Sequence, residues 1–196
     1  MKIAASILAA NQLNILNNIK QSESDFDLLH VDMADGMFCP TLGISMGTLD
    51  KLSSMTNYEL DVHLMVNDPQ LYIEELINMR ISSLTLHVES VDFNNYIKYK
   101  KESLALGLGI LPETDIKDLS PFIDLADFVL LLCVNPGFSN QDFLISPIDR
   151  TKMFLNSFPD YKGYISVDGS VKNEHIKELD NLGVKMAIQG SAIFDR

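Results

Sequence analysis

Eight apolar, strand-like segments recur along the chain, and the stretches between them carry apolar residues at helical spacing. The segments cover residues 2–8, 26–32, 59–65, 83–88, 106–111, 127–134, 163–168 and 185–190. Most intervals match the length of a strand plus a crossover helix. Strands that are apolar almost throughout and alternate with helices predict a parallel sheet covered by helices.

Two intervals carry clear helix boundaries. Residues 67–79 begin with Asn67 or Asp68 as a possible N-cap and have Pro69 in the first turn, followed by apolar residues at helical spacing. Residues 173–184 repeat this pattern and reach Gly183, a residue type that favours the position just after a helix. Both intervals are predicted to be crossover helices.

Eight such units favour a closed (β/α)8 TIM barrel over an open doubly wound sheet. No G-x-G-x-x-G motif follows the first strand, which weakens the dinucleotide-binding alternative. We expect a single domain over residues 1–196 with a final helix that is short or missing, because the printed sequence stops soon after the eighth strand. In such barrels the chemistry lies where the strands end and the following loops begin.

Charge and cysteine content narrow the range of partners. The formal net charge is −12, and both nucleic acids and anionic membranes need clustered Lys and Arg, so neither is expected as a partner. A small phosphorylated ligand stays compatible, because backbone amides can bind phosphate. Cys39 and Cys133 provide neither a disulfide framework nor thiolate metal-site spacing, which favours a reducing, cytoplasmic location. The apolar start after Lys2 resembles a signal peptide, but the first strand accounts for it.

Ionisable side chains gather at the predicted strand ends. His30 and Asp32 are two positions apart, so they point to the same face of the second strand just before a turn. A buried strand carries such a pair only with a partner or a task. The other strand ends contribute Ser6, Asp61, His63, His87, Glu89, Asp168, Gly190 and Ser191.

These residues also have structural interpretations. A lone histidine at a strand end is more often a hydrogen-bonded structural residue, and Asp168 before Gly169 could simply start a turn. Asp61 is expected to orient or cap another group, and His175 is expected to be solvated in the helix after the seventh strand. Two histidines and two aspartates from three strands nevertheless match the composition of a mononuclear metal site. Spacing alone leaves the two interpretations balanced.

Glycine turns follow the last three strands, at residues 135–141, 167–173 and 189–194. In this fold the loops after strands seven and eight often bind phosphate, and glycine lets backbone N–H groups approach an anion. Tight turns without a ligand also use glycine. Three neighbouring turns therefore favour a phosphate site without proving one.

With these stretches assembled, the chain resembles the ribulose-phosphate 3-epimerase family from end to end. The matching motifs are S-I-L (6–8), H-V-D-M-A-D-G-M-F-C-P-T (30–41), D-V-H-L-M-V (61–66), L-H-V-E-S (86–90), V-N-P-G-F-S-N-Q (134–141), V-D-G-S (167–170) and G-S-A-I-F (190–194). The resemblance implies a (β/α)8 isomerase that inverts C3 of a ketose phosphate, of the D-ribulose 5-phosphate to D-xylulose 5-phosphate type, by proton transfer through an enediolate. It also implies a homo-oligomer, a dimer or larger.

The resemblance further implies the roles of individual residues. One divalent metal ion would be held by His30, Asp32, His63 and Asp168, with Asp32 and Asp168 doubling as the acid/base pair. The metal would act as a Lewis acid on the enediolate, and the ligand set suits zinc, iron, manganese and cobalt alike. Substrate contacts are implied for Ser6, His63, Met65, Gly137, Phe138, Ser139, Gly169, Ser170, Gly190 and Ser191.

Several positions depart from the family pattern. Ala34 and Leu132 stand where methionine is common, and only Met65 matches that set. Ser170, together with L-P-E-T (111–114), resembles the D-allulose-6-phosphate 3-epimerase branch instead. The choice between a pentulose and a hexulose phosphate stays open.

Two competing functions fit parts of the same sequence. A non-catalytic phosphosugar-binding relative is motivated by Ser139 and Asn140, which replace two glycines of the phosphate loop, but all four proposed metal ligands are retained. Lyases and decarboxylases of phosphate-binding barrels usually need a lysine at an inner strand end. Lys185 lies at the start of the eighth strand, on the opposite rim.

Overall fold

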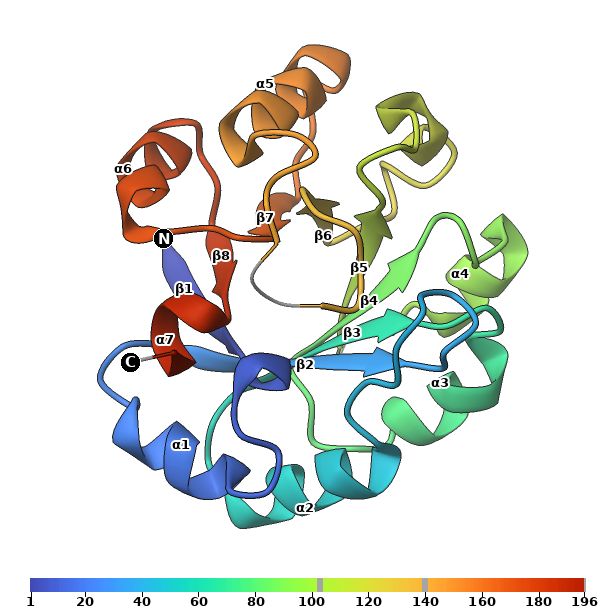
Figure 1. The fold of residues 1–196 in the computed structure, drawn as a ribbon. Helices are drawn as coiled ribbons and strands as arrows, with labels where there is room; N and C mark the ends of the chain where they lie inside the picture. Colours follow the sequence, from blue (N-terminus) through green and yellow to red (C-terminus); the bar gives the residue numbers. More distant parts are fainter. Residues whose placement is uncertain (102–103, 139–140, 196) are drawn as a thin grey trace.

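Eight parallel strands close into a barrel in the computed structural model, which describes residues 1–101, 104–138 and 141–195 (Figure 1). Each strand pairs with the next in sequence, and β1 closes the barrel against β8. The strands are β1 Lys2–Ser6, β2 Leu28–Ala34, β3 Leu60–Met65, β4 Ser83–His87, β5 Ala105–Ile110, β6 Phe128–Leu132, β7 Tyr164–Asp168 and β8 Met186–Gln189. The predicted (β/α)8 fold is confirmed, and every predicted segment overlaps a strand.

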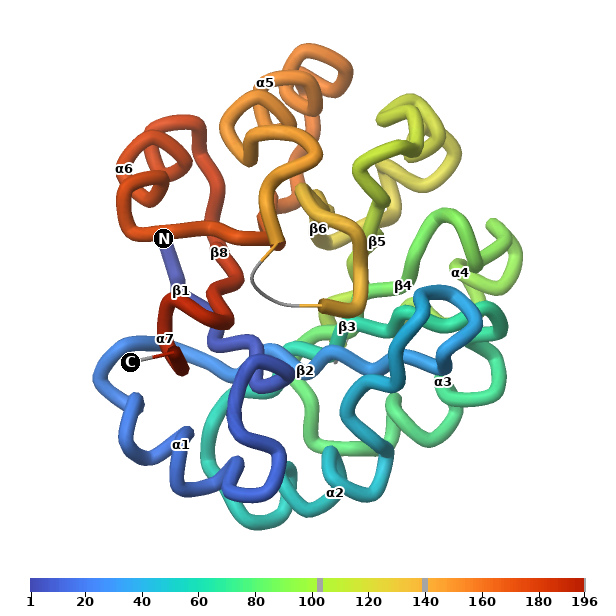
Figure 2. Tube along the Cα trace, viewed as in Figure 1, coloured from blue at the N-terminus to red at the C-terminus, as the bar shows by residue number. Residues whose placement is uncertain are grey.

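Helices form a ring around the barrel (Figure 1), and the chain trace in Figure 2 shows the same alternation. Between β5 and β6 the 3-10 helix η2 takes the place of an α-helix. The helices are η1 Ile7–Ala9, α1 Ile15–Gln21, α2 Met46–Met55, α3 Gln70–Leu76, α4 Phe93–Tyr99, η2 Ile116–Leu119, α5 Pro147–Ser157, α6 Asn173–Asn181 and α7 Ser191–Phe194.

The boundaries of the two predicted helices follow from local chemistry. The Gln70 N–H at the start of α3 donates to Asp68 Oδ1 at 3.2 Å, across Pro69. After α6, Gly183 has a φ of 89° and donates its N–H to the carbonyl of Asp180. Both helices are therefore confirmed. Gly183 lies just after the end of α6, where glycine is favoured, whereas the N-cap of α3 is Pro69, one position after the predicted Asp68.

The strand boundaries differ from the predicted ones by one or two residues at most ends, and two of these differences change the architecture of the barrel rim. The first segment, expected over residues 2–8, leaves the sheet after Ser6 and continues as η1. Strand β2 runs two residues beyond the predicted end, because it pairs with β3 as far as Ala34 and Met65.

The core has two parts. The larger part lies between the sheet and the helices, and a smaller cluster fills the barrel. The smaller cluster consists of Ala4, Leu28, Leu130, Leu132, Met186 and Ile188, none of which is more than 4% exposed. Full burial of each of the larger apolar side chains contributes about 1.5–3 kcal/mol. This packed floor supports the polar residues that follow at the strand ends.

Strand pairing is uneven around the barrel. Six residue pairs join β2 to β3, whereas two pairs, Ser166 with Met186 and Val167 with Ala187, join β7 to β8. Both cysteines are buried and carry free thiols. Within the described ranges, none of the helices is long and apolar enough to cross a membrane.

Candidate active site

Four side chains that the sequence analysis proposed as metal ligands converge at the carboxyl ends of β2, β3 and β7. One ligand atom from each of His30, Asp32, His63 and Asp168 lies within 4.8 Å of the others. His30 Nε2 and His63 Nδ1 lie 3.2 and 3.1 Å from Asp32 Oδ1. Each of these nitrogens also lies 3.9 Å from Asp168 Oδ2. The register of β2 with β3, which sets Asp32 beside His63, brings two of the ligands together.

The four groups shift one another's pKa values. Burial opposes ionisation of Asp32, but His30 and His63 outweigh it and hold the pKa of Asp32 below its usual range. Burial would lower the pKa of His30, yet Asp32 and Asp61 raise it well above its ordinary value. Burial raises the pKa of Asp168, and the nearby Asp32 adds to this rise while His30 opposes it. The two aspartates thus differ in proton affinity, a pattern found in acid/base pairs.

His30 is oriented by a carboxylate behind it. Its Nδ1 lies 2.7 Å from Asp61 Oδ2, and Asp61 also accepts a hydrogen bond from the Ser83 hydroxyl. His30 Nε2 is buried and has no hydrogen-bond partner. Because Nδ1 donates to Asp61, Nε2 is the nitrogen that faces the cluster, and loss of its proton would give it the lone pair of a histidine metal ligand. The expectation that Asp61 orients another group is confirmed.

His63 is oriented through a second histidine. Its Nε2 lies 2.8 Å from His87 Nε2, and His87 Nδ1 lies 3.0 Å from Glu89 Oε2. Burial lowers the pKa of His87 to about 4, so this ring is neutral. The sequence predicts His87 and Glu89 at the rim but gives them no role, and the signal that marks them is their H-x-E spacing at the end of β4.

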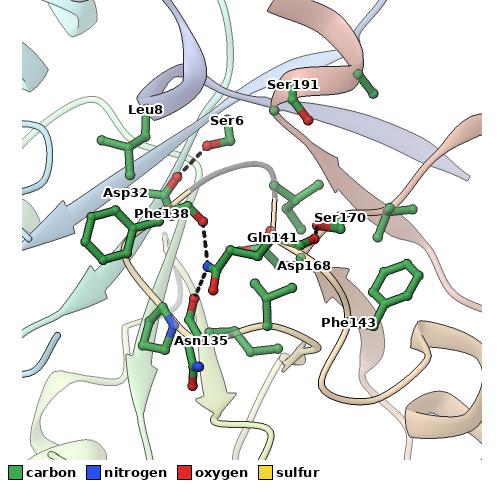
Figure 3. A pocket seen from close by; sticks show the side chains of 18 of the residues that line it. Ser6, Leu8, Asp32, Asn135, Phe138, Gln141, Phe143, Asp168, Ser170 and Ser191 are labelled. Atoms are coloured by element: carbon green, nitrogen blue, oxygen red, sulfur yellow. Dashed lines mark hydrogen bonds between the residues drawn. The ribbon is translucent and has the colours of Figure 1, made fainter. Parts of the chain in front are cut away.

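A cavity of about 730 Å³ opens above the cluster. His30 and His63 are fully buried beside Asp32. Figure 3 shows Ser6 joined to Asp32 and, on other loops, Ser170 beside Gln141. Ten of the proposed substrate contacts and catalytic residues line the cavity: Ser6, Asp32, Met65, Gly137, Phe138, Asp168, Gly169, Ser170, Gly190 and Ser191.

The turns that line this cavity have torsions that favour glycine. Gly137 and Gly169 have φ values of 105° and 106°. Ser170 follows with a φ of 53°, and its hydroxyl donates to the Gln141 carbonyl. Gln141 Nε2 in turn donates to the carbonyls of Asn135 and Phe138 at 2.6 and 2.8 Å (Figure 3). This bracing role of Gln141 was missed in the sequence, because its backbone partners become known only in the folded loop.

The remaining predicted positions have varied outcomes. Ser139 and Asn140 lie outside the described residues. Leu132, at a position where methionine is common in the family, lines the cavity. The expectation for His175 is wrong: its side chain is 14% exposed, and its Nδ1 accepts the Lys172 N–H at 3.0 Å, so it caps α6.

A family model described as the Ribulose-phosphate 3 epimerase family matches residues 2–194. The chain belongs to this family. Ribulose-phosphate 3-epimerase of Helicobacter pylori (strain J99) is 30% identical, with 100% of this chain and 91% of the relative covered. Its counterpart in Bacillus subtilis (strain 168) is 31% identical, with 99% and 92% covered. The resemblance found in the sequence and the isomerase class expected from it are confirmed.

Solved structures support the barrel at lower identity. The 3-hexulose-6-phosphate synthase of Salmonella typhimurium has a TM-score of 0.74 at 15% identity, covering 100% of this chain and 92% of that one. Phosphoribosyl anthranilate isomerase of Thermus thermophilus has a TM-score of 0.68 at 13% identity, covering 98% and 88%. At this identity the likeness shows the fold alone.

Proposed function

We propose that this ribulose-phosphate 3-epimerase family member is a metal-dependent epimerase that inverts C3 of a ketose phosphate, interconverting D-ribulose 5-phosphate and D-xylulose 5-phosphate. The observation that carries the proposal is the convergence of two aspartates and two histidines beneath one cavity. The names of its relatives support the substrate class.

The donor set fits one divalent cation. His30 Nε2 is buried without a hydrogen-bond partner, and Asp32 Oδ1 faces both histidines. Two neutral and two anionic ligands match the charge of the ion. Held by His30, Asp32, His63 and Asp168, the ion would supply positive charge that stabilises the enediolate, and this ligand set suits zinc, iron, manganese or cobalt.

Asp32 and Asp168 are the groups proposed to transfer the proton. Inversion at C3 needs one group to remove the proton from one face and another to return a proton to the opposite face. Asp32 lies near the end of β2 and Asp168 ends β7, so they approach the cavity from separate strands. Their pKa values are shifted in opposite directions, which supports the division of roles between base and acid.

The phosphate is proposed to bind at the turns after β6, β7 and β8. Gly137 and Gly169 have positive φ values, which suit turns that aim backbone amides at an anion. Lys172 is the one basic side chain among the described lining residues, so backbone amides would carry most of the binding. Phe138, Ser139, Ser170, Gly190 and Ser191 complete the proposed contacts.

Turnover measurements test the proposal. D-ribulose 5-phosphate and D-allulose 6-phosphate are each incubated with protein whose metal content is measured on the same sample. Epimerisation of the pentulose is expected, and preference for the hexulose would favour the alternative epimerase that Ser170 and residues 111–114 suggest. Metal-replete protein that turns over neither would contradict the proposal and favour the non-catalytic alternative. A single domain with a short final helix, a homo-oligomer and a cytoplasmic location stay predictions.

A further inference from the structure

The contact between His63 and His87 constrains the positions of their ring hydrogens. Their Nε2 atoms lie 2.8 Å apart, so one must donate a hydrogen and the other must accept it. The second ring nitrogen of His87, Nδ1, lies 3.0 Å from Glu89 Oε2. A carboxylate can only accept, so His87 carries its hydrogen on Nδ1 and, as a neutral ring, accepts at Nε2. His63 therefore carries a hydrogen on Nε2. Its Nδ1 lies 3.1 Å from Asp32 Oδ1, so a hydrogen that it shares with this carboxylate is the one that a metal ion would displace.

We propose that Glu89 and His87 form a positioning relay that keeps the Nε2 hydrogen on His63 and makes Nδ1 the nitrogen of His63 that binds the metal. The relay rests on the metal site of the proposed function. His30 obtains the same orientation directly from Asp61 at 2.7 Å, whereas His63 needs an intermediate ring to reach its carboxylate.

The surroundings of His87 hold the ring in one place. It is fully buried and stacks on His63, with ring centroids 5.0 Å apart. Phe38 packs on it with a centroid distance of 4.7 Å. On the β5 side, a Cβ at Gly109 would lie 2.9 Å from His87 Nε2, so glycine is what leaves room for the ring. A ring enclosed in this way keeps Nδ1 on Glu89 and Nε2 on His63, so the hydrogen position set by Glu89 determines the hydrogen position on His63.

Glu89 is itself fixed as an acceptor. Its Oε1 accepts the Leu111 N–H at 2.8 Å and the Thr114 hydroxyl at 2.5 Å. The carbonyls of the same two residues accept from the buried Arg150 guanidinium at 2.7 and 3.2 Å. The loop is thus held from two sides, and the backbone N–H of Leu111 requires an oxygen at the Oε1 position.

This geometry makes Glu89→Gln a sharp test. The amide oxygen must face Leu111 N–H, which turns the amide NH2 toward His87 Nδ1. His87 must then accept at Nδ1 and donate from Nε2, so His63 accepts at Nε2 and keeps its hydrogen on Nδ1, where it blocks the metal. The shape of the side chain barely changes, so the fold is expected to survive. Thr114→Val is the matched control, because it removes one hydrogen bond to Glu89 but leaves the carboxylate.

The readouts are the ¹⁵N chemical shifts of the His87 ring and the affinity for Zn²⁺ in competition with a chromophoric chelator. We expect a hydrogen on Nδ1 of His87 in the wild type and in T114V, and on Nε2 in E89Q. Zinc affinity should fall about 10- to 100-fold in E89Q, the usual cost of losing a group that orients a ligand, and stay close to wild type in T114V.

Two substitutions of His87 test whether another hydrogen-bonding side chain can replace the ring and preserve zinc affinity. His87→Leu fills the site without hydrogen-bonding groups and should weaken zinc binding as E89Q does. His87→Gln can accept from His63 through its oxygen and donate to Glu89 through its nitrogen, so it should retain most of the affinity. A merely structural role would not separate these two variants in this way.

The outcomes distinguish the relay from the proposed reaction. A wild-type His87 with its hydrogen on Nε2, or an E89Q protein with unchanged ring shifts and zinc affinity, would overturn the relay. Neither measurement uses turnover. Protein that binds zinc with the expected variant pattern but epimerises no substrate would leave the relay standing and contradict the proposed function alone.

Discussion

The Ser6 hydroxyl donates a 2.6 Å hydrogen bond to Asp32 Oδ2, while Asp32 Oδ1 faces His30 and His63. The register of β1 with β2, which pairs Ser6 with His30, puts the hydroxyl at this height. One carboxylate oxygen is thus directed to the histidines and the other to a neutral donor at the cavity wall. This arrangement restricts the orientation of the group that we propose to move the proton.

Ser6→Ala is expected to lower kcat/KM by about 10- to 100-fold, because a hydrogen bond to a charged group is worth about 1.5–3 kcal/mol. Metal content should stay unchanged, since Ser6 contacts the oxygen that faces away from the histidines. Ser54→Ala, which removes an exposed hydroxyl bonded to the Lys51 carbonyl, is the control. Wild-type kinetics in metal-replete S6A would remove Ser6 from the mechanism.

Asp32→Asn and Asp168→Asn are each expected to reduce turnover by at least about 100-fold, the usual size of general acid–base catalysis. Because each residue is also a proposed metal ligand, metal content must be measured in every variant. The wild-type reaction in deuterated water should give early product with solvent hydrogen at C3 and none at C1. Product that retains its original C3 hydrogen, without shielded internal transfer, would contradict the two-aspartate mechanism.

Metal affinity should rise with pH because the raised pKa of His30 makes a proton compete with the ion. In metal-free protein this group stabilises the fold fully below about pH 6.5, and that stabilisation is lost as the pH rises through the folded-state pKa. Titration calorimetry in buffers of different ionisation enthalpy should detect proton release on metal binding. Asp61→Asn removes one cause of the shift and should weaken this dependence. A metal affinity that stays constant as the pH rises from about 6.5 through the folded-state pKa of His30 would be inconsistent with a protonated His30.

Gly169→Ala should impair phosphate binding and stability together. At a φ of 106°, an added Cβ would lie 2.8 Å from Val134 Cγ2, so we expect a loss of about 1–3 kcal/mol and a raised KM for the phosphorylated substrate. Gly183→Ala is the matched control, because its φ is also positive at 89° but no atom lies within 4 Å of the added Cβ. It should lose about 1–2 kcal/mol and keep its KM. An unphosphorylated ketose turned over as well as the phosphate would show that the proposed phosphate site is wrong.

The barrel was predictable because its strands are buried on both faces. A strand such as Phe128–Leu132 is apolar throughout, and the regular intervals leave room for crossover helices. Strand ends then meet at one rim in any such barrel, so the convergence of His30, Asp32, His63 and Asp168 could be anticipated without coordinates.

The groups behind the ligands were less predictable, because they depend on neighbouring strands and loops. Which strand-end histidine contacts His63 depends on the height of β4 against β3, and the space for the His87 ring depends on Gly109 in β5. Arg150 was overlooked for a related reason. A single arginine in a helix pattern indicates an exposed side chain, yet here it is 2% exposed and bound to loop carbonyls.

The sparse pairing between β7 and β8 should make this part of the barrel open locally more often than the rest of the sheet. With two residue pairs along this seam, amide hydrogen exchange should be fastest where Ser166 and Val167 meet Met186 and Ala187. The loops that continue from these two strands are two of the three proposed to hold the phosphate. A phosphate bound to both loops would link β7 to β8 where their own pairing is sparse. Substrate would therefore stabilise this part of the barrel, and amide hydrogen exchange should slow more between β7 and β8 than between β2 and β3.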